Sequence, residues 1–153
     1  MYDDHEILST TKVDEVELVA VDAPIIEEPS YRKVDRIARS LGYPVLPPTL
    51  GPMRYLTRRA WSLFNELTRI GVTVIETHPR SALLSSGYAN VRDLVAGSGL
   101  TSRVKLEGLR RDEVDAVISA IVAYCYVTGF CIDEVRAEDG VIYIIRRVEA
   151  PRM

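Results

Sequence analysis

Two short apolar runs of this sequence each end in a carboxylate that is soon followed by proline. Strands are predicted over 17–22 and 72–77, because both segments are brief and rich in β-branched residues. Asp22 ends the apolar part of the first run and Glu76 that of the second. Open α/β sheets bind ligands at the carboxyl ends of their strands, so both acids are candidate site residues. Neighbouring carboxylates repel one another unless they are protonated or bridged by a cation, so the pattern indicates a divalent-metal site.

The segment between the two runs predicts helices, and hence parallel strands. Residues 31–41 and 53–70 carry apolar side chains at helical spacing, and a glycine follows each segment. A strand, helices and a second strand make a right-handed crossover with parallel strands.

Beyond the second strand the pattern is clear only in the last third of the chain. A helix is predicted over 112–128 and a hairpin over 132–147, with its turn at 138–140. A short helix is one interpretation of 91–95, within a less regular segment at 80–108. Residues 4–14 give a weak helical signal.

Length and composition predict one globular domain over 1–153, with apolar residues at 47% of the 153 residues. The net charge of −3 gives no global basic field, which argues against tight, nonspecific nucleic-acid binding. An acidic pocket that handles phosphates through a metal stays compatible with it. The absence of glutamine and the scarcity of asparagine suit a thermophilic source, although genome base composition gives the same bias.

The termini and apolar stretches indicate a cytoplasmic protein without membrane association. The N-terminus is acidic and polar, so no signal peptide is visible. The longest apolar stretch, 116–127, is too short to span a bilayer. Cys125 and Cys131 are interpreted as small buried apolar side chains, with nothing that marks them as metal ligands or redox partners.

Two further acids begin the helix predicted over 112–128. Asp112 suits a helix cap, and it is also kept among the candidate metal ligands. Asp115 flanks the apolar stripe one turn later, so it is predicted to face the interior as a site acid. For Asp22 the competing interpretation is a structural acid that hydrogen-bonds the turn after its strand.

Arg32, His78 and Arg80 are candidate substrate-binding residues. Arg32 lies within one helical turn of Asp35, which indicates either a solvated, ion-paired helix face or a site that holds a phosphate. His78 suits a general base, a metal ligand or a structural histidine at a strand end. No phosphate-binding glycine loop and no Gly-x-Ser-x-Gly element is present, so nucleotide-driven phosphoryl transfer and serine-hydrolase chemistry have no support.

The ordered set of these segments resembles the domain of unknown function 429 family, predicted nucleases of the ribonuclease-H-like superfamily. The resemblance rests on residues 21–24, 32–36, 53–59, 75–80 and 112–116. It implies an α/β fold with a mixed sheet flanked by helices, and Asp22, Glu76 and Asp115 around Mg²⁺ or Mn²⁺. Such a site would cut a phosphodiester between two metal ions, with a nucleic acid or another phosphate ester as substrate.

The chain departs from the family pattern before residue 17. The family begins with a Gly-Ile-Asp strand that opens a hairpin and supplies a first metal acid, and no such segment is found here. Either the start of the chain is placed late or this is an N-terminally abridged version. In both cases we expect an exposed sheet edge, which a homodimer could cover. The functional hypothesis is a metal-dependent nuclease or phosphodiesterase. The alternatives are a catalytically inactive binding module and a small-molecule hydrolase that uses His78 as its base.

Overall fold

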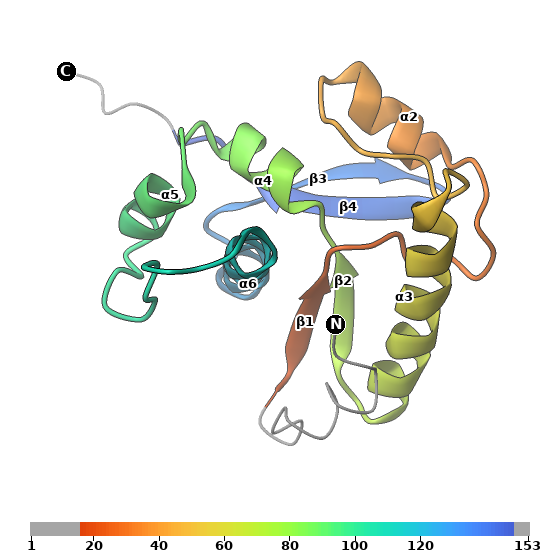
Figure 1. Ribbon diagram of the computed structural model, residues 1–153, viewed down its shortest axis with the longest axis horizontal. Coiled ribbons are helices and arrows are strands. Elements are labelled where there is room, and N and C mark those ends of the chain that lie inside the picture. Colours follow the sequence, from red (N-terminus) through yellow and green to blue (C-terminus); the bar gives the residue numbers. More distant parts are fainter. Residues whose placement is uncertain (1–15, 149–153) are drawn as a thin grey trace.

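The computed structural model describes residues 16–148, which form a mixed α/β fold with five helices and two two-stranded sheets (Figure 1). The mixed α/β class predicted from the sequence is confirmed at this level. None of these helices combines the length and apolar character needed to cross a bilayer. In chain order the elements are β1 (Leu18–Val21), α2 (Lys33–Ser40), α3 (Pro52–Arg69), β2 (Thr73–Glu76), α4 (Pro79–Ser86), α5 (Val91–Gly97), α6 (Arg111–Thr128), β3 (Ile132–Ala137) and β4 (Gly140–Ile145).

β1 and β2 are parallel, as the sequence predicts. Their register pairs Leu18 with Thr73 at one end and Val21 with Glu76 at the other. Asp22 therefore follows β1 at the carboxyl end of the strand pair, where β2 also ends. Among residues 16–148 no strand covers the other edge of β1, and the homodimer through that edge stays a prediction.

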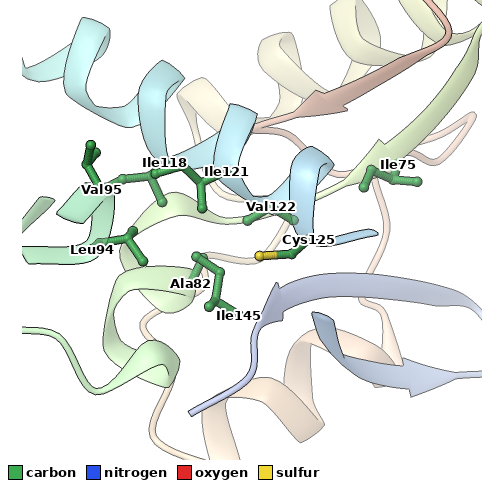
Figure 2. Packing of buried hydrophobic residues seen from close by; sticks show 9 residues of the cluster. All are labelled: Ile75, Ala82, Leu94, Val95, Ile118, Ile121, Val122, Cys125 and Ile145. Atoms are coloured by element: carbon green, nitrogen blue, oxygen red, sulfur yellow. The ribbon is translucent and has the colours of Figure 1, made fainter. Parts of the chain in front are cut away.

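The main core lies between the β1–β2 pair, α6 and α4. α6 packs along β1, and α3 lies along β2 on the other side of the pair (Figure 1). Figure 2 shows the α6 side chains converging on α4, α5 and the end of β4. The buried cluster comprises Ile75, Ala82, Leu94, Val95, Ile118, Ile121, Val122, Cys125 and Ile145. Burying such a cluster is the main favourable term in folding.

The two small sheets meet at Thr77, directly after β2. Thr77 forms a parallel bridge to Tyr143 of β4, and its hydroxyl donates a 2.7 Å hydrogen bond to the Tyr143 carbonyl. The β3–β4 hairpin is thereby fixed beside the carboxyl end of β2, with α2 packed against it. The turn of the same hairpin caps α2, because the Asp139 carboxylate accepts hydrogen bonds from the amides of Lys33 and Val34.

α4 is the one helix of the described part that the sequence analysis did not predict. It begins at Pro79 after His78, whose ring nitrogen Nδ1 accepts a hydrogen bond from the Ser81 amide. Proline suits the first helical position because its missing N–H is not needed there. Small side chains such as Ala82 and Ser86 are buried on this helix, so it lacks the apolar periodicity that would have identified it.

The interpretation of the two cysteines as separate buried thiols is wrong, because Cys125 and Cys131 form a disulfide. It links the last turn of α6 to the segment that enters β3. Cys125 itself is wholly buried in the main core. The six-residue separation gave no sign of this pairing, since it depends on the reversal of the chain at Gly129, a left-handed residue that ends α6.

Replacing Cys131 by serine is expected to lower the free energy of unfolding by about 2 kcal/mol, the loop-closure value for so short a loop. Urea denaturation of the oxidised protein would measure the loss. Dithiothreitol should destabilise the wild type by a similar amount and leave Cys131→Ser unchanged. Equal stability of the two proteins under oxidising conditions would contradict the expectation.

Candidate functional site

A buried arginine at the start of α2 binds two carboxylates from different parts of the chain. The Arg32 guanidinium donates to Asp35 through Nε (2.8 Å) and Nη2 (2.7 Å). It also donates to Glu76 through Nη1 (2.8 Å) and Nη2 (2.6 Å). The exposed fractions of Arg32, Asp35 and Glu76 are 3%, 2% and 6%. We call these three residues the Arg32 cluster.

The Arg32 cluster follows from where α2 begins and β2 ends. Arg32 is the N-cap residue of α2, and Asp35 lies in the first turn, so the two side chains can meet. Glu76 ends β2, and its Oε2 also accepts a 2.9 Å hydrogen bond from the Ile25 amide. The interpretation of Arg32 and Asp35 as a solvated, ion-paired face is therefore wrong, because the hairpin and the loop after β1 bury both side chains.

Burial and pairing act in opposite directions on the ionisation of the Arg32 cluster. Burial lowers the pKa of Arg32, but its hydrogen bonds with Glu76 and Asp35 raise that pKa above its ordinary value overall. Burial raises the pKa of Glu76, and the hydrogen bonds and charge of Arg32 oppose that rise. A buried guanidinium with this set of partners is a structural group.

The structure does not bring Asp22, Glu76 and Asp115 together as three metal ligands. Both oxygens of Glu76 are engaged by Arg32, and within residues 16–148 no three His, Cys, Asp or Glu side chains are placed to hold a metal ion. Glu76 as a ligand and Arg32 as a substrate-binding residue are thus corrected by the geometry, because each side chain satisfies the other.

Asp22 and Asp115 do lie near one another, across a groove between β1 and α6. The groove has a volume of about 580 Å³ and is lined by both acids, with Asp112 beside them. Although Asp22 is exposed to solvent, partial desolvation by the surrounding protein raises its pKa from 3.8 to about 6, and the negative charge of Asp115 adds to the rise. Within the described residues neither carboxylate accepts a hydrogen bond or joins an ion pair. This is the arrangement that a cation would relieve.

Asp112 neither caps α6 nor occupies the interior. The N-cap residue is Arg110, whose amide donates a 2.8 Å hydrogen bond to Glu113. Asp112 is exposed and lies 3.6 Å from the Arg110 guanidinium. Asp112 lines the groove and adds negative charge to it, but its position does not identify it as a metal ligand.

His78 lies at the end of β2 and shares a second cavity with Asp22. Its Nδ1 is 2.6 Å from the Ser81 hydroxyl, which fixes the ring at the start of α4. Burial lowers the pKa of His78, Asp115 acts to raise it, and the nearby charge of Arg80 lowers it. His78 is therefore neutral at neutral pH. Arg80 is exposed in the first turn of α4, so it is free to meet an anion.

The second cavity has a polar side, which includes Asp22 and His78, and an apolar wall. The sequence did not indicate that the residues of this wall belong to the site. The volume of the cavity is about 210 Å³, and Asp22 and His78 line it together with the Arg32 cluster. Its apolar wall comes from the proline-rich loop and the start of α3, namely Val45, Leu46, Met53 and Leu56. The four prolines of 44–52 were the feature of the sequence that could have indicated this wall, since they make the loop rigid.

No protein-family model matches the chain, and no curated protein or solved structure matches it either. The resemblance to the domain of unknown function 429 family consequently stays a prediction. What the site can do is inferred from its own residues.

Replacing Arg32 by methionine is expected to lower the free energy of unfolding by about 3–5 kcal/mol, because it leaves two buried carboxylates without their cation. Urea denaturation measures the change. Arg36→Met is the matched control, since Arg36 is exposed on the same helix and its loss should cost less than about 0.5 kcal/mol. Similar losses for the two variants would show that the Arg32 cluster does not stabilise the fold.

Asp115→Asn is expected to lower the pKa of Asp22 below about 6, although the larger effect of desolvation remains, and a ¹³C NMR titration of the carboxyl carbon measures the change. Because this pKa is raised in the folded state, its contribution to stability is present at acid pH and is lost as pH rises through 6. Asp22→Asn should therefore gain stability relative to wild type above pH 6. An Asp22 pKa that is unchanged in Asp115→Asn would rule out the interaction.

Proposed function

We propose that this chain is a divalent-cation-dependent phosphodiesterase, with Mg²⁺ or Mn²⁺ held by Asp22 and Asp115. The observation that carries the proposal is a pair of carboxylates that line one groove and have no hydrogen-bond or ion-pair partner among the described residues. Desolvation and the charge of Asp115 raise the pKa of Asp22. Asp22 follows β1 at the carboxyl ends of the two parallel strands, the usual place for ligands in α/β sheets, and Asp115 lines the same groove from α6. Such perturbed groups are enriched at functional sites.

Two carboxylates suit Mg²⁺, which usually retains several waters and takes the rest of its ligands from one or two acids and substrate phosphates. A site with three acids and two metal ions does not fit, because both carboxylate oxygens of Glu76 accept hydrogen bonds from Arg32. When bound, the cation would polarise the phosphoryl group and lower the pKa of a water molecule.

His78 and Arg80, which lie near the acid pair, would transfer the proton of the attacking water and orient the phosphate ester. His78 is neutral and held by Ser81, so its imidazole suits acceptance of the proton of an attacking water. The water oxygen bonds to phosphorus, the ester P–O bond breaks, and the proton returns to the leaving oxygen. Arg80, exposed in the first turn of α4, would contact the phosphate as it binds.

The fold that accompanies this proposal is a ribonuclease-H-like domain of the domain of unknown function 429 family. The parallel β1–β2 pair and the placement of Asp22 and Asp115 support it. The alternative function is a catalytically inactive binding module. The specific observation in its favour is the loss of Glu76 from the acids that the family resemblance would require.

Addition of Mg²⁺ or Mn²⁺ is expected to raise the Tm by about 5–10 °C at a concentration near 100 times the Kd, since the cation binds only the folded chain. Differential scanning fluorimetry measures the shift. Asp22→Asn and Asp115→Asn should each abolish it, and Glu107→Gln, an exposed acid outside the groove, should preserve it.

The same variants test catalysis with bis(p-nitrophenyl) phosphate as substrate. Hydrolysis should require the cation, disappear in Asp22→Asn, and fall as pH drops through 6 because Asp22 becomes protonated. A cation-dependent Tm shift without hydrolysis favours the binding module. No shift in any buffer, or a shift retained by both asparagine variants, contradicts the proposal.

A further inference from the structure

We propose that the surface formed by α2, the loop after it and the first half of α3 binds single-stranded nucleic acid and presents it to the acid pair. The inference rests on the proposed phosphodiesterase function and names its substrate class. It is carried by three features of that surface: its charge, an exposed aromatic ring and its continuity with the cavity beside Asp22.

The charge of this segment is opposite to that of the whole chain. Residues 29–65 contain seven basic side chains and one acidic side chain, whereas the chain as a whole has a net charge of −3. Two of the seven do not contribute to the free positive charge, because Arg32 is buried and paired with Asp35 and Glu76, and Lys33 pairs with Glu138. Arg36, Arg39, Arg54 and Arg58 are exposed, so the excess positive charge faces solvent. A local basic patch on an acidic protein is suited to a phosphate backbone.

Arg54 and Arg58 are placed against the local preference of their helix. They are one turn apart on the exposed side of α3, and neither joins an ion pair within the described part of the chain. Arg54 lies in the first turn of α3, where a cation opposes the helix dipole, and like charges at the spacing of Arg54 and Arg58 repel one another. The helix would be more stable without them, so their presence indicates a ligand with negative charge.

Tyr55 provides a ring on which a base can stack. Its side chain is 61% exposed, between the two arginines in sequence. The Arg59 guanidinium lies 5.8 Å from the ring centroid, a cation–π contact that orients the ring. An ordered aromatic ring beside exposed cations is the usual composition of a surface for single strands.

The basic patch continues into the candidate site through the start of α3. Met53 and Leu56, which flank Arg54 and Tyr55, line the same 210 Å³ cavity as Asp22 and His78. A strand whose phosphates contact Arg54 and Arg58 could thus place an unstacked base over this apolar wall. Duplex DNA hides its base faces, and an acidic peptide has none, so both would use the charge alone.

Fluorescence anisotropy of a labelled oligothymidylate of about a dozen nucleotides, measured in EDTA, tests binding apart from catalysis. We expect the single strand to bind more tightly than the matching duplex or polyglutamate. Arg54→Glu with Arg58→Glu should lower the slope of log K against log salt by about 0.7 per lost contact. An acid at position 54, in the first turn of α3, favours the helix dipole. An unchanged Tm would show that lost binding is not unfolding.

Arg92→Glu with Arg103→Glu is the matched control, because both arginines are exposed outside the patch and should leave binding unchanged. Tyr55→Ala should weaken binding by roughly tenfold, and Tyr55→Phe should retain most of it. Equal binding of duplex or polyglutamate, or equal effects of the two arginine pairs, would overturn the inference. Cation-dependent hydrolysis of bis(p-nitrophenyl) phosphate by wild type is read separately, so its failure would count against the proposed function alone.

Discussion

The Arg32 guanidinium, held between Asp35 and Glu76, is the interaction on which the rest of this structure depends. It joins the start of α2 to the end of β2, and the two residues that meet there, Arg32 and Glu76, are 44 residues apart in the sequence. The hairpin closes over it so tightly that a Cβ at Gly140 would lie 3.2 Å from Arg32 Nη1, and the neighbouring Asp139 caps α2. A buried charge is costly unless it is paired and hydrogen-bonded, so these elements must assemble together.

The same cluster divides the acids of the sheet edge into two kinds. Glu76 becomes a structural carboxylate, because its oxygens are satisfied by Arg32 and by the Ile25 amide. Among the described residues Asp22 and Asp115 have no such partner, and desolvation together with the negative charge of Asp115 raises the pKa of Asp22. The phosphodiesterase chemistry that we propose therefore depends on Asp22 and Asp115 and not on Glu76. His78 lies between the two groups, fixed by Ser81 and kept neutral by burial.

The sequence predicted the parts of the fold that depend on local periodicity. The parallel strands, α2, α3, α6 and the hairpin followed from apolar spacing and glycine stops, and the placement of Asp22 and Glu76 at one edge followed from parallel pairing. It did not predict which acid would be neutralised, because the Arg32–Glu76 contact exists only after α2 docks on the end of β2. The disulfide and α4 were missed for similar reasons, since one depends on a chain reversal and the other buries small side chains.

The central claim is that the acid pair, and not Glu76, receives a divalent cation. A crystal of the full chain soaked in manganese, with data collected at the manganese absorption edge, tests it most directly. The account predicts an anomalous peak between the Asp22 and Asp115 carboxylates, with the Arg32 cluster unchanged. A peak bonded to Glu76 with Arg32 displaced, or no peak at the groove at concentrations that saturate other Mn²⁺ enzymes, would contradict it.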